Sequence, residues 1–149
     1  MRWLADLFYF IAGLIYLPVA IFQALVRGKN RRGWGERFGF VRTRDPSRIR
    51  VWIHAVSLGE INATPKLTAA LRERQPELEI VFSTTTDTGY RRAVELYGAD
   101  HVFRFPLDFS LAIETALQRI RPTLIALVEL EVWFNLVRMA TRRGFRWRW

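Results

Sequence analysis

Hydrophobic residues occur in short continuous runs from residue 51 onward, and each run is followed by a longer stretch with helical spacing. The runs lie at residues 51–56, 79–83, 101–105 and 123–128. Near-continuous apolar runs are typical of strands that are buried on both faces. Regular alternation of strand and helix favours parallel strands joined by right-handed crossovers. The pattern therefore predicts an α/β domain over residues 51–149, built on a parallel sheet.

The sequence leaves open where the first of these helices begins. Ser57 and Glu60 have the spacing of a capping box, in which a serine and a glutamate each bond a backbone N–H group at the helix start. That start would place Pro65 inside the helix, where proline removes a hydrogen bond. Thr64 as the cap, with Pro65 at the first helical position, fits equally well and makes residues 57–63 an exposed loop.

The remaining helix signals are clearer. Apolar spacing predicts that Leu67, Ala70 and Leu71 form the inward face of the first helix. A second helix is expected to stop at Gly98, because glycine is favoured just beyond a helix C-terminus. Ser110 is expected to cap a third helix, and a fourth helix follows the last apolar run.

An uncharged run of about twenty residues, 7–26, precedes the domain and has the length that a bilayer core requires. Arginine and lysine follow it directly, which favours an uncleaved membrane anchor in residues 1–26 over a cleaved signal peptide. A buried pair of core helices broken at Pro18 is the other alternative. By the positive-inside rule, the anchor places residue 27 onward on the cytoplasmic side.

Positive charge is concentrated in two flanks of the chain, whose net charge is +9. Residues 27–50 hold nine basic and two acidic residues, and residues 138–149 hold five basic and no acidic ones. The first flank is expected to be a juxtamembrane segment that lies against anionic lipid headgroups. Nucleic-acid binding is disfavoured, because this charge adjoins a membrane segment and no nucleic-acid motif is present. With no cysteine and two histidines, the sequence predicts no metal site and no cofactor.

Several polar residues follow the predicted strands, and the carboxyl ends of parallel strands share the sheet edge where ligands bind. The candidates for ligand contact are Ser57, Gly59, Glu60, Thr85, Thr86, Glu129 and Glu131. Glu60 is placed to take a proton from an alcohol, although a helix cap explains it equally well. Glu129 and Glu131 alternate across a strand end, so only one of them faces a given side; both could instead be solvated loop acids. The threonine-rich turn at 84–89 could hold a polar ligand or simply connect a strand to a helix.

The segment 34–40, Trp-Gly-Glu-Arg-Phe-Gly-Phe, mixes aromatic and charged residues close to the predicted anchor. It could be an amphipathic piece that lies on the bilayer surface. It could instead bind an anionic, amphiphilic substrate, and Arg37 is then the candidate for contact with the negative charge. The sequence does not choose between the two.

Taken in order, the motifs resemble the N-terminal half of the 3-deoxy-D-manno-octulosonic acid (Kdo) transferases. The matching stretches are Arg-Gly-Trp-Gly-Glu-Arg-Phe-Gly-Phe at 32–40, Ile-His-Ala-Val-Ser-Leu-Gly-Glu at 53–60, Thr-Thr-Thr-Asp-Thr-Gly at 84–89, Phe-Pro-Leu-Asp-Phe at 105–109 and Val-Glu-Leu-Glu-Val-Trp-Phe-Asn-Leu at 128–136. These enzymes transfer Kdo from CMP-Kdo to lipid A precursors during lipopolysaccharide synthesis. The resemblance implies the Rossmann-like N-terminal domain of a GT-B glycosyltransferase, which binds the lipid acceptor. Glu60 falls on the family's Ser-x-Gly-Glu motif and is thereby implied as the general base.

The sequence also departs from this family. Val132 and Phe134 stand where leucine and proline are usual, and Asp87 stands where a proline is usual. The second GT-B domain, which binds most of the CMP-Kdo donor, is expected to be absent, so the chain is expected to be an acceptor-binding half without activity of its own. A non-catalytic, membrane-bound remnant that binds anionic lipid is the alternative. The resemblance implies a location on the cytoplasmic face of the cell inner membrane.

Overall fold

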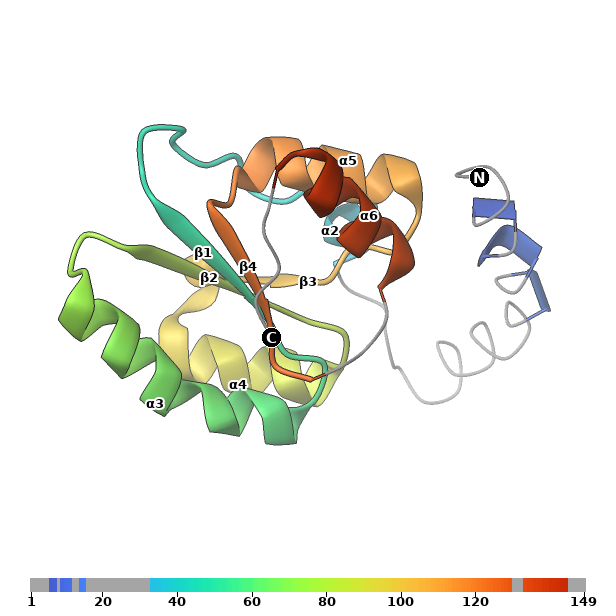
Figure 1. Cartoon of the computed structure of the whole chain (residues 1–149). Helices are drawn as coiled ribbons and strands as arrows, with labels where there is room; N and C mark the ends of the chain where they lie inside the picture. Colours follow the sequence, from blue (N-terminus) through green and yellow to red (C-terminus); the bar gives the residue numbers. More distant parts are fainter. Residues whose placement is uncertain (1–5, 8, 12–13, 16–32, 130–132, 145–149) are drawn as a thin grey trace.

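The computed structural model describes residues 6–7, 9–11, 14–15, 33–129 and 133–144, and its centre is a parallel β-sheet (Figure 1). The described sheet has four strands in the order β3-β2-β1-β4. The strands are β1 (Arg50–His54), β2 (Glu79–Thr84), β3 (Val102–Arg104) and β4 (Leu124–Leu127). Neighbouring strands pair in parallel throughout. This confirms the α/β class and the parallel pairing predicted from the apolar runs.

In the described part of the chain, two long helices cover each face of the sheet (Figure 1). The helices are α3 (Leu58–Arg74) and α4 (Asp87–Tyr97) on one face, and α5 (Ser110–Ile120) and α6 (Phe134–Arg142) on the other. A short helix, α2 (Trp34–Arg37), contacts β3, and a 3-10 turn (Ala99–His101) leads into that strand. Each connection between consecutive strands contains a helix, as parallel pairing requires.

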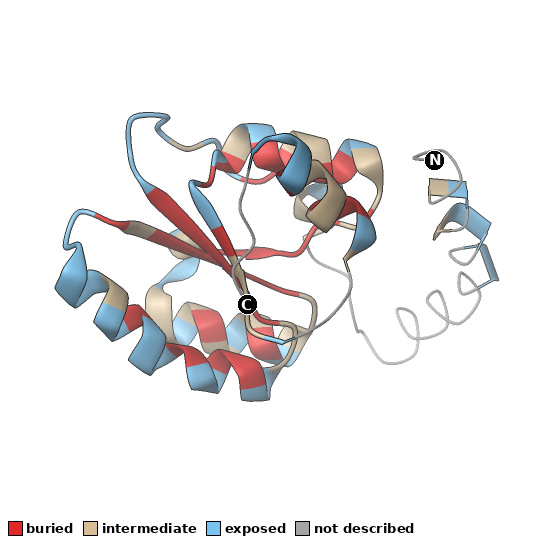
Figure 2. Ribbon diagram, in the orientation of Figure 1, coloured by how far each residue is buried: buried red, intermediate tan, exposed pale blue. Residues whose placement is uncertain are grey.

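The side chains of β1 alternate between the two faces and so contribute to two separate cores, seen as the buried interior in Figure 2. Trp52 packs with Phe103 and Phe105 beneath α5 and α6. Val51 and Ile53 belong to the core beneath α3 and α4. Every residue of β1 is buried, which explains why its central residues, 51–53, are apolar without alternation.

The first long helix begins at the capping box and not at Pro65. The Ser57 hydroxyl accepts the backbone N–H of Glu60 at 3.4 Å, and the Glu60 carboxylate accepts the backbone N–H of Ser57 at 3.0 Å. Pro65 therefore lies inside α3, where it leaves the carbonyl of Ile61 without its usual donor. The hydroxyl of Thr64 donates to that carbonyl at 2.7 Å and replaces the missing bond.

The prediction for the inward face of α3 is wrong for two of its three residues. Leu67 is 43% exposed and Ala70 is also exposed, whereas Leu71 packs against the core. The buried positions of the helix are Glu60, Ile61, Thr64 and Thr68. Threonine can be buried here because its hydroxyl bonds a carbonyl of the same helix, as Thr68 does at 2.9 Å. An apolar spacing rule does not find such residues.

Ser110, expected as the cap of α5, is its first helical residue, and the cap position is held by a residue without a capping side chain. The cap comes instead from Asp6. Its Oδ1 accepts the backbone N–H of Ser110 at 3.1 Å and the Ser110 hydroxyl at 3.0 Å. The same oxygen accepts Nδ2 of Asn135, in the first turn of α6, at 3.2 Å. One N-terminal carboxylate thus joins the first turns of α5 and α6.

Among the described residues, no helix has the length and apolar character needed to cross a membrane. Most of the predicted anchor, including residues 16–26, lies outside the described residues, as do residues 27–32 of the basic flank. Five large apolar residues of the anchor that are described expose between 49% and 75% of their surface: Leu7, Phe10, Ile11, Leu14 and Ile15.

The described part of the basic flank is less exposed than its composition suggests. Arg50 is fully buried, and its Nη2 lies 2.6 Å from Oε2 of Glu79. Arg44 pairs with the same carboxylate group at 3.0 Å, and Arg37 is buried as well. These three guanidinium groups stabilise the fold. They are therefore not available to bind lipid headgroups, although the charge count had predicted that the whole flank would do so.

Candidate functional site

The strand order reverses between β1 and β4, and the carboxyl ends of these two strands form the switch point of the sheet. The chain leads from β1 outward to β2 and β3, and then returns to the other side of β1 for β4. In open α/β sheets, ligands bind in the crevice beside this point. Ser57, Gly59 and Glu60 follow β1, and Glu129 follows β4. The structure therefore brings these candidates to the switch point.

The carboxylate of Glu60 is fixed by three hydrogen bonds, and 8% of the residue is exposed. Its Oε2 accepts the backbone N–H of Val56 at 2.7 Å. Its Oε1 accepts the backbone N–H and the hydroxyl of Ser57 at 3.0 and 2.7 Å. Glu60 is therefore a helix cap, which is one of the two roles that the sequence suggested for it. A carboxylate has about four lone-pair positions, so Oε2 keeps the capacity to accept from one further donor.

The backbone beside this carboxylate is open. Gly59 is the second residue of α3, and a Cβ built on it would meet only the Ser57 hydroxyl, at 3.9 Å. The first N–H groups of a helix have no intrahelical partner and carry the positive end of the helix dipole. A polar group of a ligand can approach the chain here without displacing a side chain.

The threonine-rich turn after β2 is tied to the end of β1 through one carbonyl group. The hydroxyls of Thr84, Thr85 and Thr86 lie 2.9, 3.1 and 3.3 Å from the carbonyl oxygen of Val56 and donate to it. Thr86 also caps α4, because its hydroxyl accepts the backbone N–H of Gly89 at 3.1 Å. These contacts are typical of a turn that connects a strand to a helix. They favour this interpretation of residues 84–89 over that of a ligand-binding turn.

Gly89 allows α4 to begin this close to β1. A Cβ at this position would lie 2.6 Å from the hydroxyl oxygen of Thr84 and 3.3 Å from the carbonyl carbon of Ser57. Any larger residue would therefore push α4 away from Ser57, the N-cap of the helix that carries Glu60. Gly89 lies in the motif at 84–89, but its spacing there does not indicate this role.

Arg37 lies beside the same turn, but inside the protein. Its Nη2 donates to the carbonyl of Thr85 at 3.1 Å, and 9% of the residue is exposed. Burial, and then the nearby charge of Arg104, lower the pKa of Arg37. Arg104 itself pairs with Asp87 at 2.6 Å and lies over the ring of Tyr90, 4.5 Å from its centre. The two arginines thus hold α2, the turn and α4 together.

Sequence reasoning missed Arg104. It is the last residue of β3, all of whose residues are buried. A buried charge needs a partner. A single arginine within the apolar run at 101–105 was therefore the sequence signal that could have identified Arg104 as a structural residue. Its partner, Asp87, could not be identified from the sequence, because the two residues are joined only by the packing of α4 beside β3.

The structure describes only one of the two acidic residues that were predicted to contact a ligand after β4. Glu129 is exposed, two residues beyond the end of the strand. Glu131 lies outside the described residues. Among the residues that the structure describes, no group of three or more His, Cys, Asp or Glu side chains could hold a metal ion.

His54 ends β1 close to the switch point, but it is a core residue. Its ring stacks on Phe105 with the ring centres 4.0 Å apart, and Nδ1 lies 2.8 Å from the Ser83 hydroxyl. Burial lowers the pKa of His54 to about 4, so the imidazole is neutral at pH 7. Its enclosure between aromatic rings suits packing rather than proton transfer to a ligand.

Comparison with known proteins shows the family to which this chain belongs. The sequence model of the family described as 3-Deoxy-D-manno-octulosonic-acid transferase (kdotransferase) matches residues 32–147. The chain belongs to the Kdo transferase family. A relative from Chlamydophila psittaci, named 3-deoxy-D-manno-octulosonic acid transferase, is 32% identical over 144 residues, which are 95% of this chain and 33% of the relative.

Relatives of the same name from Haemophilus influenzae and Bordetella pertussis are 36% and 38% identical and are matched over 72% of this chain. The matches cover 26% and 27% of those relatives. The chain thus spans about a third or less of the length of the Kdo transferases it matches. No solved structure matches it. The resemblance to Kdo transferases seen in the motifs is confirmed, and the four-stranded parallel sheet fits the Rossmann-like N-terminal domain that it implied.

Proposed function

We propose that this chain is the acceptor-binding part of a glycosyltransferase that transfers Kdo from CMP-Kdo to a lipid A precursor in lipopolysaccharide synthesis. In the proposed reaction, a hydroxyl of the acceptor gives its proton to Glu60. The acceptor oxygen forms a bond to the anomeric carbon of Kdo, and the bond from that carbon to the phosphate of CMP breaks. Family membership and the position of Glu60 support this proposal.

The observation that carries the proposal is the acceptor capacity left on the Glu60 carboxylate. A general base must lie within hydrogen-bond reach of the proton that it takes, and its geometry must be fixed. Three donors from Val56 and Ser57 fix the carboxylate at the switch point, and the single donor on Oε2 leaves that oxygen the capacity to accept one more. That further donor is the acceptor hydroxyl in our proposal.

The other candidates divide into two groups by what their polar atoms already contact. We propose that Gly59 leaves space for the acceptor and that Glu129 receives one of its hydroxyls across the switch point. For Glu131 we propose the same type of contact. The second group, Ser57, Thr85, Thr86 and Arg37, bonds within the protein, and we propose that it positions the loop between β1 and α3.

We propose that residues 1–149 supply only a minority of the contacts to CMP-Kdo. The support is length, because the chain corresponds to 33% of the Chlamydophila psittaci relative. A GT-B enzyme binds its donor largely with its second domain, as the family resemblance implied. The test of catalysis below therefore uses a fusion protein.

We also propose that the protein acts at the cytoplasmic face of the cell inner membrane and that its N-terminal apolar segment contacts lipid. The support is the uncharged run at 7–26 and the exposure of its described apolar residues, which is between 49% and 75%. Alkaline carbonate extraction of membranes that contain the tagged chain tests this. Retention in the pellet is expected, and full release into the supernatant would contradict it.

The test of Glu60 is its replacement in an active protein. Residues 1–149 are fused to the remaining C-terminal part of the Haemophilus influenzae relative, and transfer of Kdo from CMP-Kdo to a lipid A precursor is measured. General-base assistance contributes about 10²–10⁴-fold, so Glu60→Gln is expected to lower turnover by that order. Glu73→Gln, an exposed glutamate on the same helix, is the matched control and is expected to leave turnover unchanged.

The structure adds one requirement to this test. Both oxygens of Glu60 accept hydrogen bonds, so the amide nitrogen of glutamine meets a donor on one side and costs roughly 1 kcal/mol of stability. The thermal midpoint of each fusion is therefore measured and the assay is run well below it. Near-normal turnover by a folded Glu60→Gln fusion would remove Glu60 from the catalytic role.

A further inference from the structure

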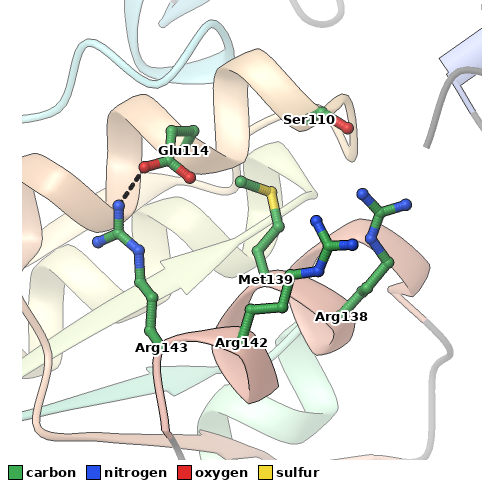
Figure 3. A pocket seen from close by; sticks show the side chains of 6 residues that line it. All are labelled: Ser110, Glu114, Arg138, Met139, Arg142 and Arg143. Atoms are coloured by element: carbon green, nitrogen blue, oxygen red, sulfur yellow. Dashed lines mark hydrogen bonds and ion pairs between the residues drawn. The ribbon is translucent and has the colours of Figure 1, made fainter.

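A pocket of about 130 Å³ lies between α5 and α6, and its lining is strongly basic (Figure 3). The lining residues are Ser110, Glu114, Arg138, Met139, Arg142 and Arg143. Three arginines and one glutamate give this lining a net charge of +2. None of these residues belongs to the switch-point site, and none was a candidate for ligand contact in the sequence.

Three of the polar groups in the pocket are engaged within the protein. Arg143 forms an ion pair with Glu114, which Figure 3 shows as a dashed line. The hydroxyl of Ser110 donates to Asp6 at 3.0 Å. These contacts leave Arg138 and Arg142 as the groups that can receive a ligand.

Arg138 and Arg142 form no hydrogen bond or ion pair with any other residue that the structure describes. The Nε atom of Arg138 is buried and has no hydrogen-bond partner there. A buried donor without an acceptor is costly, and such atoms are rare in folded proteins. Positions four apart in a helix lie on the same face, where two like charges repel each other. Figure 3 shows both side chains on the pocket side of α6.

An anion in the pocket would remove both costs. Guanidinium groups present several N–H donors in a fixed plane, which matches the oxygens of phosphate or carboxylate. A phosphate monoester has a charge of about −1.5 to −2 near pH 7, which balances the +2 of the lining. Met139 adds an apolar surface for the carbon chain beside the phosphate.

We propose that the pocket between α5 and α6 is a binding site for a phosphate monoester, held by Arg138 and Arg142. The phosphate can belong to a lipid headgroup or to a soluble molecule, and the chemistry of recognition is the same for both. The N-terminal residue Asp6 is attached to the rim of the pocket through Ser110. This site goes beyond the proposed transfer reaction and requires neither Glu60 nor a sugar donor.

The test measures binding of two probes to the full chain. The first is inorganic phosphate, followed by calorimetry, and the second is vesicles of phosphatidylcholine with or without phosphatidic acid, followed by sedimentation. The double substitution Arg138→Gln and Arg142→Gln is expected to weaken binding of the phosphate group about tenfold or more. The matched control is Arg72→Gln with Arg91→Gln, which removes the same charge from exposed positions on α3 and α4.

The pattern of losses identifies the source of the phosphate. Weaker binding of inorganic phosphate alone supports a soluble ligand, weaker binding of phosphatidic acid vesicles alone supports a lipid, and weakening of both supports the shared site. Unchanged binding of both probes, or an equal loss in the control, overturns the proposal. Arg142 is exposed, so the single substitution Arg142→Gln keeps the test valid if the double variant fails to fold. Failure of the Glu60 test leaves this result untouched, because no Kdo transfer is measured.

Discussion

The helices on the two faces of the sheet begin at the same edge, but their first turns are capped in different ways. On one face, each cap comes from the residue just before the helix. Ser57 and Glu60 form the capping box of α3, and Thr86 accepts the N–H of Gly89 at the start of α4. Such caps lie within three residues of their partners and can form together with the helix itself.

On the other face, the caps come from distant parts of the chain. Asp6 accepts the N–H of Ser110 at the start of α5 across 104 positions. Asp108 accepts the N–H groups of Asn135 and Leu136 at the start of α6 at 3.0 and 2.9 Å, across 27 and 28 positions. These bonds exist only when the chain is folded. We therefore expect loss of Asp108, the buried distant cap, to lower global stability more than loss of a local cap.

The largest effect is expected from Asp108→Ala. Asp108 is buried, and burial raises its pKa. Its removal leaves two buried N–H groups of α6 without acceptors, which is expected to lower the free energy of unfolding by roughly 4 kcal/mol. Asp108→Asn keeps one acceptor oxygen and is expected to cost about half as much. Urea denaturation of both variants checks this, and a cost of Asp108→Ala no greater than that of Ser57→Ala would end the contrast between the two faces.

The next effect is a pH dependence that comes from His54, in the aromatic core under α5 and α6. The folded chain keeps this imidazole neutral down to a pKa of about 4, whereas the unfolded chain takes up the proton at the ordinary pKa of 6.5. The unfolded state therefore binds more protons between these values, so stability is expected to rise with pH from about 4 to 6.5 and to fall on acidification. The difference amounts to roughly 3 kcal/mol.

Unfolding free energies measured across this pH range test the role of His54. The variant His54→Asn is expected to lose most of the pH dependence, whatever its stability at pH 7. His101→Asn is the matched control for removal of a histidine. If both variants flatten the curve equally, the burial of His54 is not its cause.

A smaller effect separates a true cap from a serine that only resembles one. Ser57→Ala removes the capping hydroxyl of α3 and is expected to cost about 1 kcal/mol. Ser110→Ala leaves the backbone N–H bond to Asp6 in place and is expected to cost about 0.5 kcal/mol. Chemical denaturation of the two variants under the same conditions provides the comparison. Equal costs would mean that Ser110 acts as a cap after all.

A similarly small global effect is expected from Asp6→Ala, about 0.5 kcal/mol, because the lost carboxylate is partly exposed. Its local effect is sharper. Amide hydrogen exchange at Ser110 is expected to accelerate, whereas exchange at Glu60, in the first turn of α3, stays unchanged. Asp6→Asn retains an acceptor oxygen and serves as the control. Unchanged exchange at Ser110 would show that Asp6 does not cap α5 in solution.

The two faces also differ in how far the sequence could predict them. The capping box of α3 was visible in the spacing of Ser57 and Glu60, because its partners are close in the chain. No local sequence signal indicated that Asp6, beside an apolar run, reaches α5. It also led us to assign Ser110 the role of a cap, since a serine before a helical pattern is the usual local signal.

The candidate site shows the same division. Motifs placed Glu60 at the end of a strand and identified the family, and both depend on residues that are adjacent in sequence. The partners of Arg104 and Arg50, the enclosure of Arg37 and the basic pocket between α5 and α6 depend on residues brought together by folding. The composition shows how many arginines the chain contains, but it does not show which of them are buried.

By itself, the sequence determined the four strands, the parallel α/β class, the end of α4 at Gly98 and the position of Glu60 shortly after a strand. Each of these follows from the polarity and backbone preferences of neighbouring residues. Only the tertiary structure decided the order of the strands, the side of α3 that faces the core and the caps of α5 and α6. These depend on contacts between distant residues, whose energies appear only when the helices pack on the sheet.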